Sequence, residues 1–478
     1  MEIITKGHEA KNAVMQIMQL FFSLDDNVRV ESELKTENGA SVSKAKVFYK
    51  NEEFYGEAKT EKSEPIYITN AIKKATFYAA GKIGEMPAPW GISTGIRPAK
   101  TARKMIEKGL NDDKIFSHLK DEYLMSEDKA RLALSVAHKE LGILKSMPEN
   151  SVSIYVGIPF CPSRCSYCSF ISQATEHNNK FIEPYVNALL DEIRYSAKII
   201  KELNKTVDTI YFGGGTPTAI KPNLLEKIIG AIEDNFDLSD LREFTVEAGR
   251  PDTFSKEMMC MLKRHSVGRI SINPQTMHQK TLDTIGRKHS VDDVKRAFYM
   301  AHEAGIESIN ADLIAALPGE DKHMMEYTVN ELLKLEPDAV TVHTLYMKRA
   351  SKLIDEFSRL RFTKNAAEIM DAAKAILGEN GILPYYMYKQ RNTLGNLENV
   401  GFALKGHESL YNVYIMEEVQ PIIALGAGGS TKMVRGEEIE RVYNPKEASD
   451  YTNRIDEVLK RKDAFLNFYK GEKNDGIY

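Results

Sequence analysis

After about residue 150 the chain alternates short apolar runs with longer amphipathic stretches, and this alternation constrains the fold most. We expect strands near 153–158, 208–212, 243–247, 269–273, 308–314 and 339–345. Amphipathic helices are expected between them, near 180–203, 222–235, 255–265, 278–303 and 321–335. Strands that alternate with helices form βαβ units and a parallel sheet with right-handed crossovers. A closed barrel of this kind has eight such units, so the sequence predicts an α/β fold with a partial (β/α)6 barrel.

The first part of the chain, residues 1–88, lacks that pattern and is expected to form an α+β domain. Helical spacing from Asn12 to Phe22 gives way to alternating residues at 44–49 and 54–58. Apolar residues at every second position are typical of half-buried strands. A small mixed domain therefore precedes the barrel.

The other boundaries follow from changes in composition. Residues 89–148 are interpreted as a linker and a helical segment, and the linker holds Trp90, the only tryptophan. The barrel is assigned to 149–383. The alternation fails beyond it, so 384–478 is predicted to be a C-terminal extension of mixed and helical character.

Composition excludes several classes of protein. Hydrophobic residues make up 42% of the 478 residues, which supports a large core and argues against disorder. A net charge of −4 argues against nucleic-acid binding through bulk charge. No apolar run approaches the ~20 residues that a membrane helix needs. The N-terminus lacks a signal-peptide cleavage pattern, and the sparse cysteines fit a reducing cytoplasm.

Three of the four cysteines, Cys161, Cys165 and Cys168, follow the first predicted strand. Three thiolates this close can hold three irons of a [4Fe–4S] cluster and leave the fourth iron open to a small molecule. A disulfide framework favours an even number of cysteines in a small secreted domain. A zinc site needs a fourth ligand, such as His177. The cluster is therefore the favoured interpretation, and Cys260 is expected to be a small apolar core residue in a helix.

Small and polar residues follow the other predicted strands. The run YFGGGTPT (211–218) has glycines that let a backbone approach a ligand closely, although a tight structural turn is the alternative. The Walker pattern of phosphate-binding loops is absent. Further polar residues at strand ends, or in the stretches that follow them, are Glu247, Gln275, Arg287, Asp312 and His343. Carboxylates accept from ribose hydroxyls and arginine binds carboxylates in two-pronged fashion, so the set suits S-adenosylmethionine. A lone histidine such as His343 is more often a core residue.

With these residues assembled, the chain resembles the radical SAM superfamily through its Cys-x3-Cys-x2-Cys pattern. More narrowly, it resembles the oxygen-independent coproporphyrinogen III oxidase group. The segments that carry the resemblance are YVGIPFCPSRCSYCSF (155–170), YFGGGTPT (211–218), VEAGRPD (246–252), INPQT (272–276) and NADLIAALPGE (310–320). The runs PWGISTGIRPAK (89–100) and NLENVG (396–401) are similar to the HemZ branch of that group.

This resemblance implies a partial barrel with a C-terminal helical addition, a tetrapyrrole substrate and defined site residues. Cys161, Cys165 and Cys168 match the cluster ligands. The positions that match adenosylmethionine contacts are Tyr155, Gly214, Gly215, Thr216, Glu247, Gln275, Arg287 and Asp312. Gly215 and Thr216 match contacts to a second molecule, so one or two adenosylmethionines are implied. The resemblance also implies a low-potential electron donor of flavodoxin or ferredoxin type.

Two positions depart from the best-studied branch of the group. That branch has a histidine where this chain has Gly157, and a further cysteine where this chain has Phe170. Both features are linked to decarboxylase activity in that branch. Related members that lack them act as haem chaperones or open the haem ring.

The implied activity is oxygen-independent oxidative decarboxylation of coproporphyrinogen III propionates to vinyl groups, through a 5′-deoxyadenosyl radical. Haem ring opening and a non-catalytic haem chaperone stay open as alternatives, with His343 and His407 as the histidines to test. Substrate carboxylates need cationic anchors, and the candidates are Lys348, Arg349, Lys389 and Arg391. Gln390 and Asn396 in the neighbouring polar loop are candidate lid residues, and with Arg391 they form the predicted substrate set.

Overall fold

The computed structural model describes residues 1–23, 25–83, 88–95, 97–168, 173–346, 365–390 and 393–471. The chain divides into two compact units. The first holds the described parts of 1–138, 353–368 and 387–399, and the second holds those of 139–352, 369–386 and 400–478.

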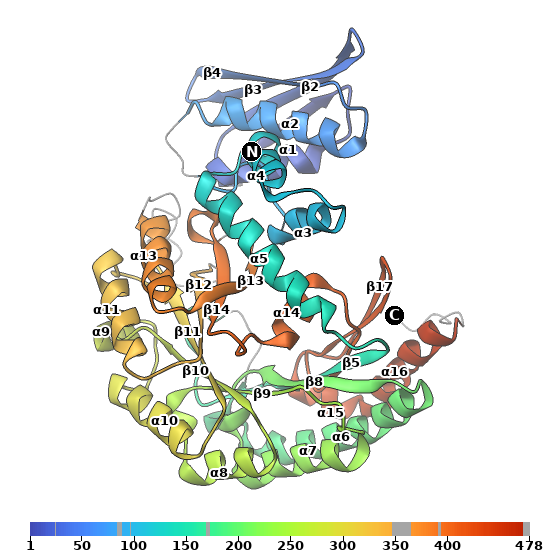
Figure 1. Ribbon diagram of the computed structural model, residues 1–478, viewed down its shortest axis with the longest axis vertical. Coiled ribbons are helices and arrows are strands. Elements are labelled where there is room, and N and C mark those ends of the chain that lie inside the picture. The colour runs from blue at the N-terminus through green and yellow to red at the C-terminus, as the bar shows by residue number, and fades with distance from the viewer. Residues whose placement is uncertain are drawn as a thin grey trace. The chain divides into compact units, whose positions relative to one another are not determined.

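The first unit contains a four-stranded sheet in the order β1-β2-β3-β4. β1 (Glu2–Lys6) is parallel to β2 (Arg29–Glu37), and β3 (Ala40–Tyr49) is antiparallel to both β2 and β4 (Glu52–Thr60). Helices α1 (Lys11–Phe21) and α2 (Pro65–Ala80) cover one face of this sheet (Figure 1). The α+β character expected of the N-terminal region is confirmed.

Three helices follow along the chain, as the helical pattern predicted, and the last of them continues past residue 138, where the first segment of this unit ends. They are α3 (Ala99–Glu107), α4 (Asp112–Tyr123) and α5 (Glu127–Lys145). The Asn111 side chain accepts from the Lys114 N–H and caps α4, while Asp112 and Asp113 complement the positive end of the helix dipole. Leu124 is in the left-handed conformation that ends α4.

The second unit is built on a sheet whose central six strands are the predicted ones. These are β5 (Ser151–Ile158), β8 (Thr206–Gly214), β9 (Glu243–Gly249), β10 (Arg269–Gln275), β11 (Ser308–Ala315) and β12 (Ala339–Thr344). Each pairs in parallel with the next. Helices α6 (Thr175–Glu202), α7 (Pro222–Asn235), α8 (Lys256–Arg264), α10 (Val291–Glu303) and α11 (Lys322–Leu333) follow the outside of the strand arc (Figure 1). The partial barrel is confirmed.

The two sides of these six strands differ in polarity. Residues on the outer side, such as Ile154, Phe212 and Val246, are fully buried and apolar. Away from its ends, each strand has one residue that is only partly buried: Tyr155, Tyr211, Glu247, Asn273, Asp312 and His343. The register places all of them on the opposite, inner side, because side chains alternate along a strand. We call these six residues the inner-wall row.

The chain continues to build the sheet beyond residue 383, where the alternation in the sequence stops. β13 (Leu383–Lys389) and β14 (Glu398–Ala403) extend it on one side, with β14 antiparallel to β12. On the other side β15 (Ile422–Leu425) is parallel to β5, followed by the antiparallel strands β16 (Ser430–Arg435) and β17 (Glu438–Tyr443). The remaining helices are α13 (Asn365–Glu379), α14 (Leu410–Glu417), α15 (Ala448–Asn453) and α16 (Ile455–Lys470).

The prediction of one continuous helix over 278–303 is wrong in the middle of that range. The structure has two helices, α9 (Gln279–Thr284) and α10, separated by a turn in which Gly286 has φ +74°. Ser290 and Asp293 form a capping box that starts α10. Arg287 therefore lies in a loop and not in a helix.

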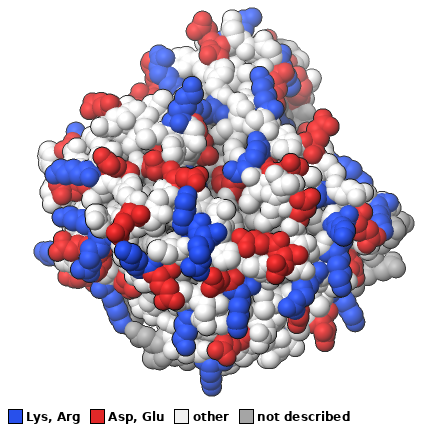
Figure 2. Space-filling view, turned by 60° about the horizontal axis from the view of Figure 1, so that its bottom comes forward, with Lys and Arg blue, Asp and Glu red and all other residues white. Residues whose placement is uncertain are grey.

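The surface carries charges of both signs. Figure 2 shows Lys and Arg interspersed with Asp and Glu over the face turned toward the viewer, with no broad area of one sign. Within the described ranges, no helix combines the length and the apolar character that a bilayer span requires.

Candidate functional site

The sequence-predicted cofactor residues lie toward one edge of the sheet in the second unit. Cys161 ends the two-residue strand β6 (Phe160–Cys161) directly after β5, and Gly214 ends β8. Glu247 lies within β9, Gln275 is the last residue of β10, and Asp312 lies within β11. The carboxyl ends of parallel strands meet at one edge, which is where chemistry collects in α/β folds.

The cysteine loop is held against the residues that follow β8 and β9. The Cys161 thiol lies 3.5 Å from the Thr216 hydroxyl oxygen. Arg250 Nη1 lies 3.8 Å from Cys165 Sγ and donates toward it. The Cys168 amide donates to the Cys165 carbonyl at 3.2 Å, which turns the loop back on itself.

A second set of contacts fixes the same loop to the turn between α9 and α10. The amide and hydroxyl of Ser166 donate to the Ile285 carbonyl at 3.2 and 3.0 Å. The guanidinium of Arg287 donates to the Tyr167 hydroxyl through Nε and Nη2, at 3.2 and 2.9 Å. Burial raises the pKa of Tyr167, and the neighbouring Arg287 opposes that shift. Across the described ranges no three His, Cys, Asp or Glu side chains already stand close enough together to hold a single metal ion.

The glycine run after β8 lies against the backbone that leads to the cysteines. The amides of Gly215 and Thr216 donate to the carbonyls of Ile158 and Phe160 at 2.8 and 2.7 Å. A Cβ on Gly215 would stand 2.4 Å from the Phe160 carbonyl oxygen, and Gly214 has φ +103°. Glycine at these two positions is thus required by the turn itself and by close approach within the chain.

Aromatic rings and a carboxyl group form one part of the inner wall. The rings of Tyr155, Tyr211 and Tyr411 are nearly parallel, with interplanar angles of 15 to 19° and centroids 4.5 to 6.4 Å apart. The Tyr211 hydroxyl donates to Glu247 Oε1 at 2.5 Å. Burial raises the pKa of Glu247 to about 7; the bond from Tyr211 lowers it and the nearby Asp312 raises it. Glu247 therefore exchanges a proton near neutral pH.

Asp312 lies farther along the same wall and has two polar neighbours. Asn310 Nδ2 donates to its Oδ1 at 2.8 Å, and His343 Nε2 lies 3.6 Å from its Oδ2. The His343 side chain is 29% exposed, so it faces the inner side and is not a core histidine. The structure therefore places His343 beside the predicted cofactor residues.

Gln275 and Arg287 are both nearly buried. Gln275 has φ +70°, and its buried Oε1 has no hydrogen-bond partner among the residues that the structure describes. An acceptor buried without a partner is costly, which fits a donor supplied by a ligand. Arg287 Nη1 donates to the Asn273 carbonyl at 2.7 Å, so this guanidinium joins the inner wall to the cysteine loop.

Two of the three residues in the predicted substrate set lie within the described ranges. Gln390 is exposed and Asn396 is half-buried, and both belong to the first unit. Lys389 is only 7% exposed and donates to the Ser93 carbonyl at 3.2 Å, so it is not an open anchor. Burial lowers the pKa of Lys389 to about 8. Arg391, Lys348 and Arg349 lie outside the described residues.

Two other predictions concern histidine and cysteine. His407 Nδ1 lies 3.6 Å from Asp338 Oδ1, before β12 begins, and so away from the carboxyl ends of the strands. Cys260 is exposed, so its prediction as a core residue is wrong. It lies on α8, whose buried face is formed by Met258, Met259, Met261 and Leu262.

Sequence reasoning missed a second glycine-rich loop at the same edge. β15 runs parallel to β5, and Gly426–Gly429 follow it. A Cβ on Gly426 would stand 2.4 Å from the Gly157 carbonyl oxygen, and one on Gly157 would stand 2.8 Å from the Ala427 carbonyl oxygen. The close packing of this loop explains why Gly157 cannot be a histidine here. The signal was the apolar run IIAL followed by GAGG, which repeats the pattern of YFGGG.

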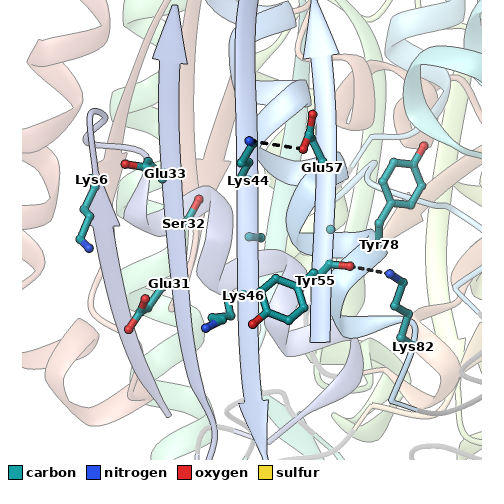
Figure 3. A pocket seen from close by; sticks show the side chains of 12 residues that line it. Lys6, Glu31, Ser32, Glu33, Lys44, Lys46, Tyr55, Glu57, Tyr78 and Lys82 are labelled. Carbon is teal, nitrogen blue, oxygen red and sulfur yellow. Dashed lines mark hydrogen bonds and ion pairs between the residues drawn. The ribbon is translucent and has the colours of Figure 1, made fainter. Parts of the chain in front are cut away.

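A pocket of about 610 Å³ lies elsewhere, on the sheet of the first unit (Figure 3). Its charged lining is largely paired within the protein. Lys44 lies 3.7 Å from Glu57, Lys46 lies 2.7 Å from Glu53, and Lys82 donates to the Tyr55 carbonyl at 2.7 Å. These pairs leave the pocket with little to offer a charged ligand.

Comparison with known proteins shows which family the chain resembles. The family model of the radical SAM superfamily matches residues 155–332. The chain is 35% identical over 472 residues to the oxygen-independent coproporphyrinogen-III oxidase-like protein HemZ of Bacillus subtilis, covering 97% of this chain and 92% of that protein. It is 33% identical over 319 residues to the heme chaperone HemW of Lactococcus lactis, covering 65% of this chain and 78% of that one. A solved structure, the coproporphyrinogen III oxidase HemN of Escherichia coli, matches with TM-score 0.50 and 22% identity over 67% of this chain and 72% of that chain.

The fold is that of a radical SAM protein, a class that generally uses a [4Fe–4S] cluster and S-adenosylmethionine. Within that superfamily the chain belongs to the family of oxygen-independent coproporphyrinogen III oxidase-like proteins that includes HemZ.

Proposed function

We propose that this protein catalyses the oxygen-independent oxidative decarboxylation of coproporphyrinogen III in porphyrin biosynthesis. Each reacting propionate loses carbon dioxide, one hydrogen atom and one electron, and becomes a vinyl group. The observation that carries the proposal is the convergence of the cysteine loop, the glycine turn and the polar strand-end residues at one edge of the barrel. The similarity to a coproporphyrinogen-III oxidase-like protein over nearly the whole chain supports it.

In this proposal Cys161, Cys165 and Cys168 hold the cluster. The residues that hold one or two adenosylmethionines are Tyr155, Gly214, Gly215, Thr216, Glu247, Gln275, Arg287 and Asp312. When bound, the two groups together supply the abstraction of a hydrogen atom from a substrate carbon. A donor of flavodoxin or ferredoxin type is the proposed source of electrons.

The residues of the chain supply position and polarity. The unpartnered Gln275 Oε1 accepts a hydrogen bond from a ligand donor, and Glu247 contributes a carboxyl group that Tyr211 holds in place. Arg287 couples the inner wall to the cysteine loop through Tyr167. Gln275 and Arg287 are nearly buried and so act away from bulk water, which limits side reactions of reactive species.

The test is product analysis by mass spectrometry under anaerobic, reducing conditions, with coproporphyrinogen III and haem offered separately. We expect loss of carboxyl groups from coproporphyrinogen and no consumption of haem. Replacing all three loop cysteines by serine abolishes the reaction, while Cys260→Ser, which changes the exposed cysteine of α8, leaves it intact. A wild-type protein that converts haem and ignores coproporphyrinogen contradicts the proposal.

A haem chaperone is the second candidate, and the similarity to HemW favours it. It predicts stoichiometric haem binding with no 5′-deoxyadenosine formed. Replacing His343, which faces the inner wall, or His407 tests whether either histidine binds haem. Formation of 5′-deoxyadenosine in step with decarboxylation decides against this candidate.

A further inference from the structure

Arg250 is a buried arginine that neither the sequence pattern nor the proposed reaction uses. It follows β9 in the run VEAGRPD and is only 3% exposed. A buried guanidinium is retained where its charge and its donors have fixed partners. The partners of Arg250 therefore indicate its purpose.

One side of the guanidinium is fixed by a two-pronged ion pair. Nε and Nη2 donate to the two carboxylate oxygens of Asp252 at 2.8 and 2.7 Å. This fork geometry fixes the plane of the guanidinium and specifies where the remaining nitrogen points.

The remaining nitrogen, Nη1, points to the cysteine loop. It lies 3.1 Å from the Ser163 hydroxyl oxygen and 3.8 Å from Cys165 Sγ. A positive charge thus stands beside one of the three loop sulfurs, away from bulk solvent. Arg287, which donates to Tyr167 in the same loop, adds a second buried cation nearby.

We propose that Arg250 tunes the electron affinity of the cluster by donating to Cys165 Sγ, in a geometry that Asp252 imposes. This inference rests on the proposed role of the three cysteines. Reduction adds one negative charge to the cluster, so a fixed cation and a hydrogen bond at a sulfur stabilise the reduced form more than the oxidised form. Arg250 therefore makes the cluster easier to reduce, and Asp252 partly offsets it. It is a positioning and tuning residue and touches no reacting atom.

The experiment is an anaerobic redox titration of the reconstituted cluster, followed by electron spin resonance, without adenosylmethionine or substrate. Arg250→Gln is expected to stabilise the oxidised form at least tenfold, which lowers the midpoint potential by about 60 mV for one electron. Arg250→Lys is expected to lower it less, because lysine keeps the charge and loses the fork. Asp252→Asn is expected to raise the potential, because the charge of Arg250 is then unopposed.

A matched control exists at the other end of the sheet. Arg242 makes the same two-pronged pair with Asp208, at 2.6 and 2.8 Å, where β8 and β9 begin. Arg242→Gln removes an equivalent pair far from the cysteine loop, and the cluster potential is expected to stay that of the wild type. Ser163→Ala removes the loop contact of Nη1 and keeps the charge, so its potential is expected to stay close to the wild-type value.

Opposite shifts of the midpoint potential in Arg250→Gln and Asp252→Asn support the inference. Unchanged potentials in both variants overturn it. A shift in Ser163→Ala equal to that in Arg250→Gln also overturns it, because Arg250 then acts only by holding the loop in place. If Arg250→Gln assembles no cluster, the sign of the shift in Asp252→Asn decides. The redox titration involves no tetrapyrrole, so the inference about Arg250 survives if the proposed decarboxylation is not observed. In the same way, unchanged potentials do not contradict the proposed decarboxylation.

Discussion

At the scale of the residue, the inner-wall row concentrates ionisable groups in a setting that shifts their protonation. Glu247 is the clearest case, because burial raises its pKa to about 7. The folded protein thus binds this proton more tightly than the unfolded chain does. The contribution of Glu247 to stability is complete below its ordinary pKa of 4.5 and is lost as pH rises through 7.

Glu247→Gln is therefore expected to make the protein without cofactors less sensitive to alkaline pH. Relative to the wild type, its free energy of unfolding rises by up to about 3 kcal/mol between pH 4.5 and pH 8, since one pKa unit is worth about 1.36 kcal/mol. Melting temperatures at the two pH values measure this. The control is Glu307→Gln, whose side chain is 74% exposed, and it should follow the wild type. Equal pH dependence in all three proteins contradicts the prediction.

At the scale of the element, the glycine turn after β8 positions the segment that carries the cysteines. The amides of Gly215 and Thr216 donate to the carbonyls of Ile158, the last residue of β5, and of Phe160. The turn therefore sets the course of the chain just before Cys161.

Gly215→Ala should disturb that course, because its Cβ would stand 2.4 Å from the Phe160 carbonyl oxygen, and a backbone atom cannot yield cheaply. We expect a loss of roughly 1–3 kcal/mol in stability and a lower iron content after reconstitution. The matched control is Gly230→Ala within α7, where no atom lies within 4 Å of the new Cβ. That change should stabilise by about 0.5–1 kcal/mol. Urea unfolding and iron analysis separate the two, and equal behaviour of both variants would count against the packing argument.

The strands of the barrel were predictable because each is buried on its outer side and reads as an apolar run. β15 was not predictable, because its four residues, Ile422–Leu425, are too few to show a periodic pattern and the strand with which they pair is remote in sequence. Tyr211 and Asn273 were missed as inner-wall residues, since their exposure depends on register. Arg250 was missed because its contact with Cys165 is tertiary and nothing in VEAGRPD shows it.

At the scale of the whole molecule, segments far apart in the chain meet at single buried charges. In the first unit, Glu398 Oε2 accepts from Trp90 Nε1 at 2.6 Å, and its Oε1 accepts from Lys129 Nζ at 2.5 Å. The Glu398 side chain is 1% exposed. The two runs that resemble the HemZ branch, 89–100 and 396–401, are thus joined by one carboxylate.

Glu398→Ala leaves the buried Lys129 ammonium without its carboxylate partner, so we expect a loss of about 3–5 kcal/mol in stability. Trp90 is the only tryptophan, so its fluorescence during urea unfolding reports on this region directly. Removing both charges in Lys129→Met with Glu398→Leu should cost less than Glu398→Ala alone. The control is Glu57→Ala, which breaks an exposed pair with Lys44 and should change stability by less than about 1 kcal/mol. A Glu398→Ala protein as stable as the wild type excludes the network as a stabilising feature.

The parallel pairing of β15 with β5 has a consequence for synthesis of the chain. Ser151 and Gln420, which bond beside these strands, are 269 residues apart. As the polypeptide leaves the ribosome, one edge of β5 keeps its backbone N–H and C=O groups open until β15, Ile422–Leu425, has emerged. An open strand edge invites pairing with another nascent chain. The time needed to translate the residues between β5 and β15 therefore sets how long this edge stays exposed.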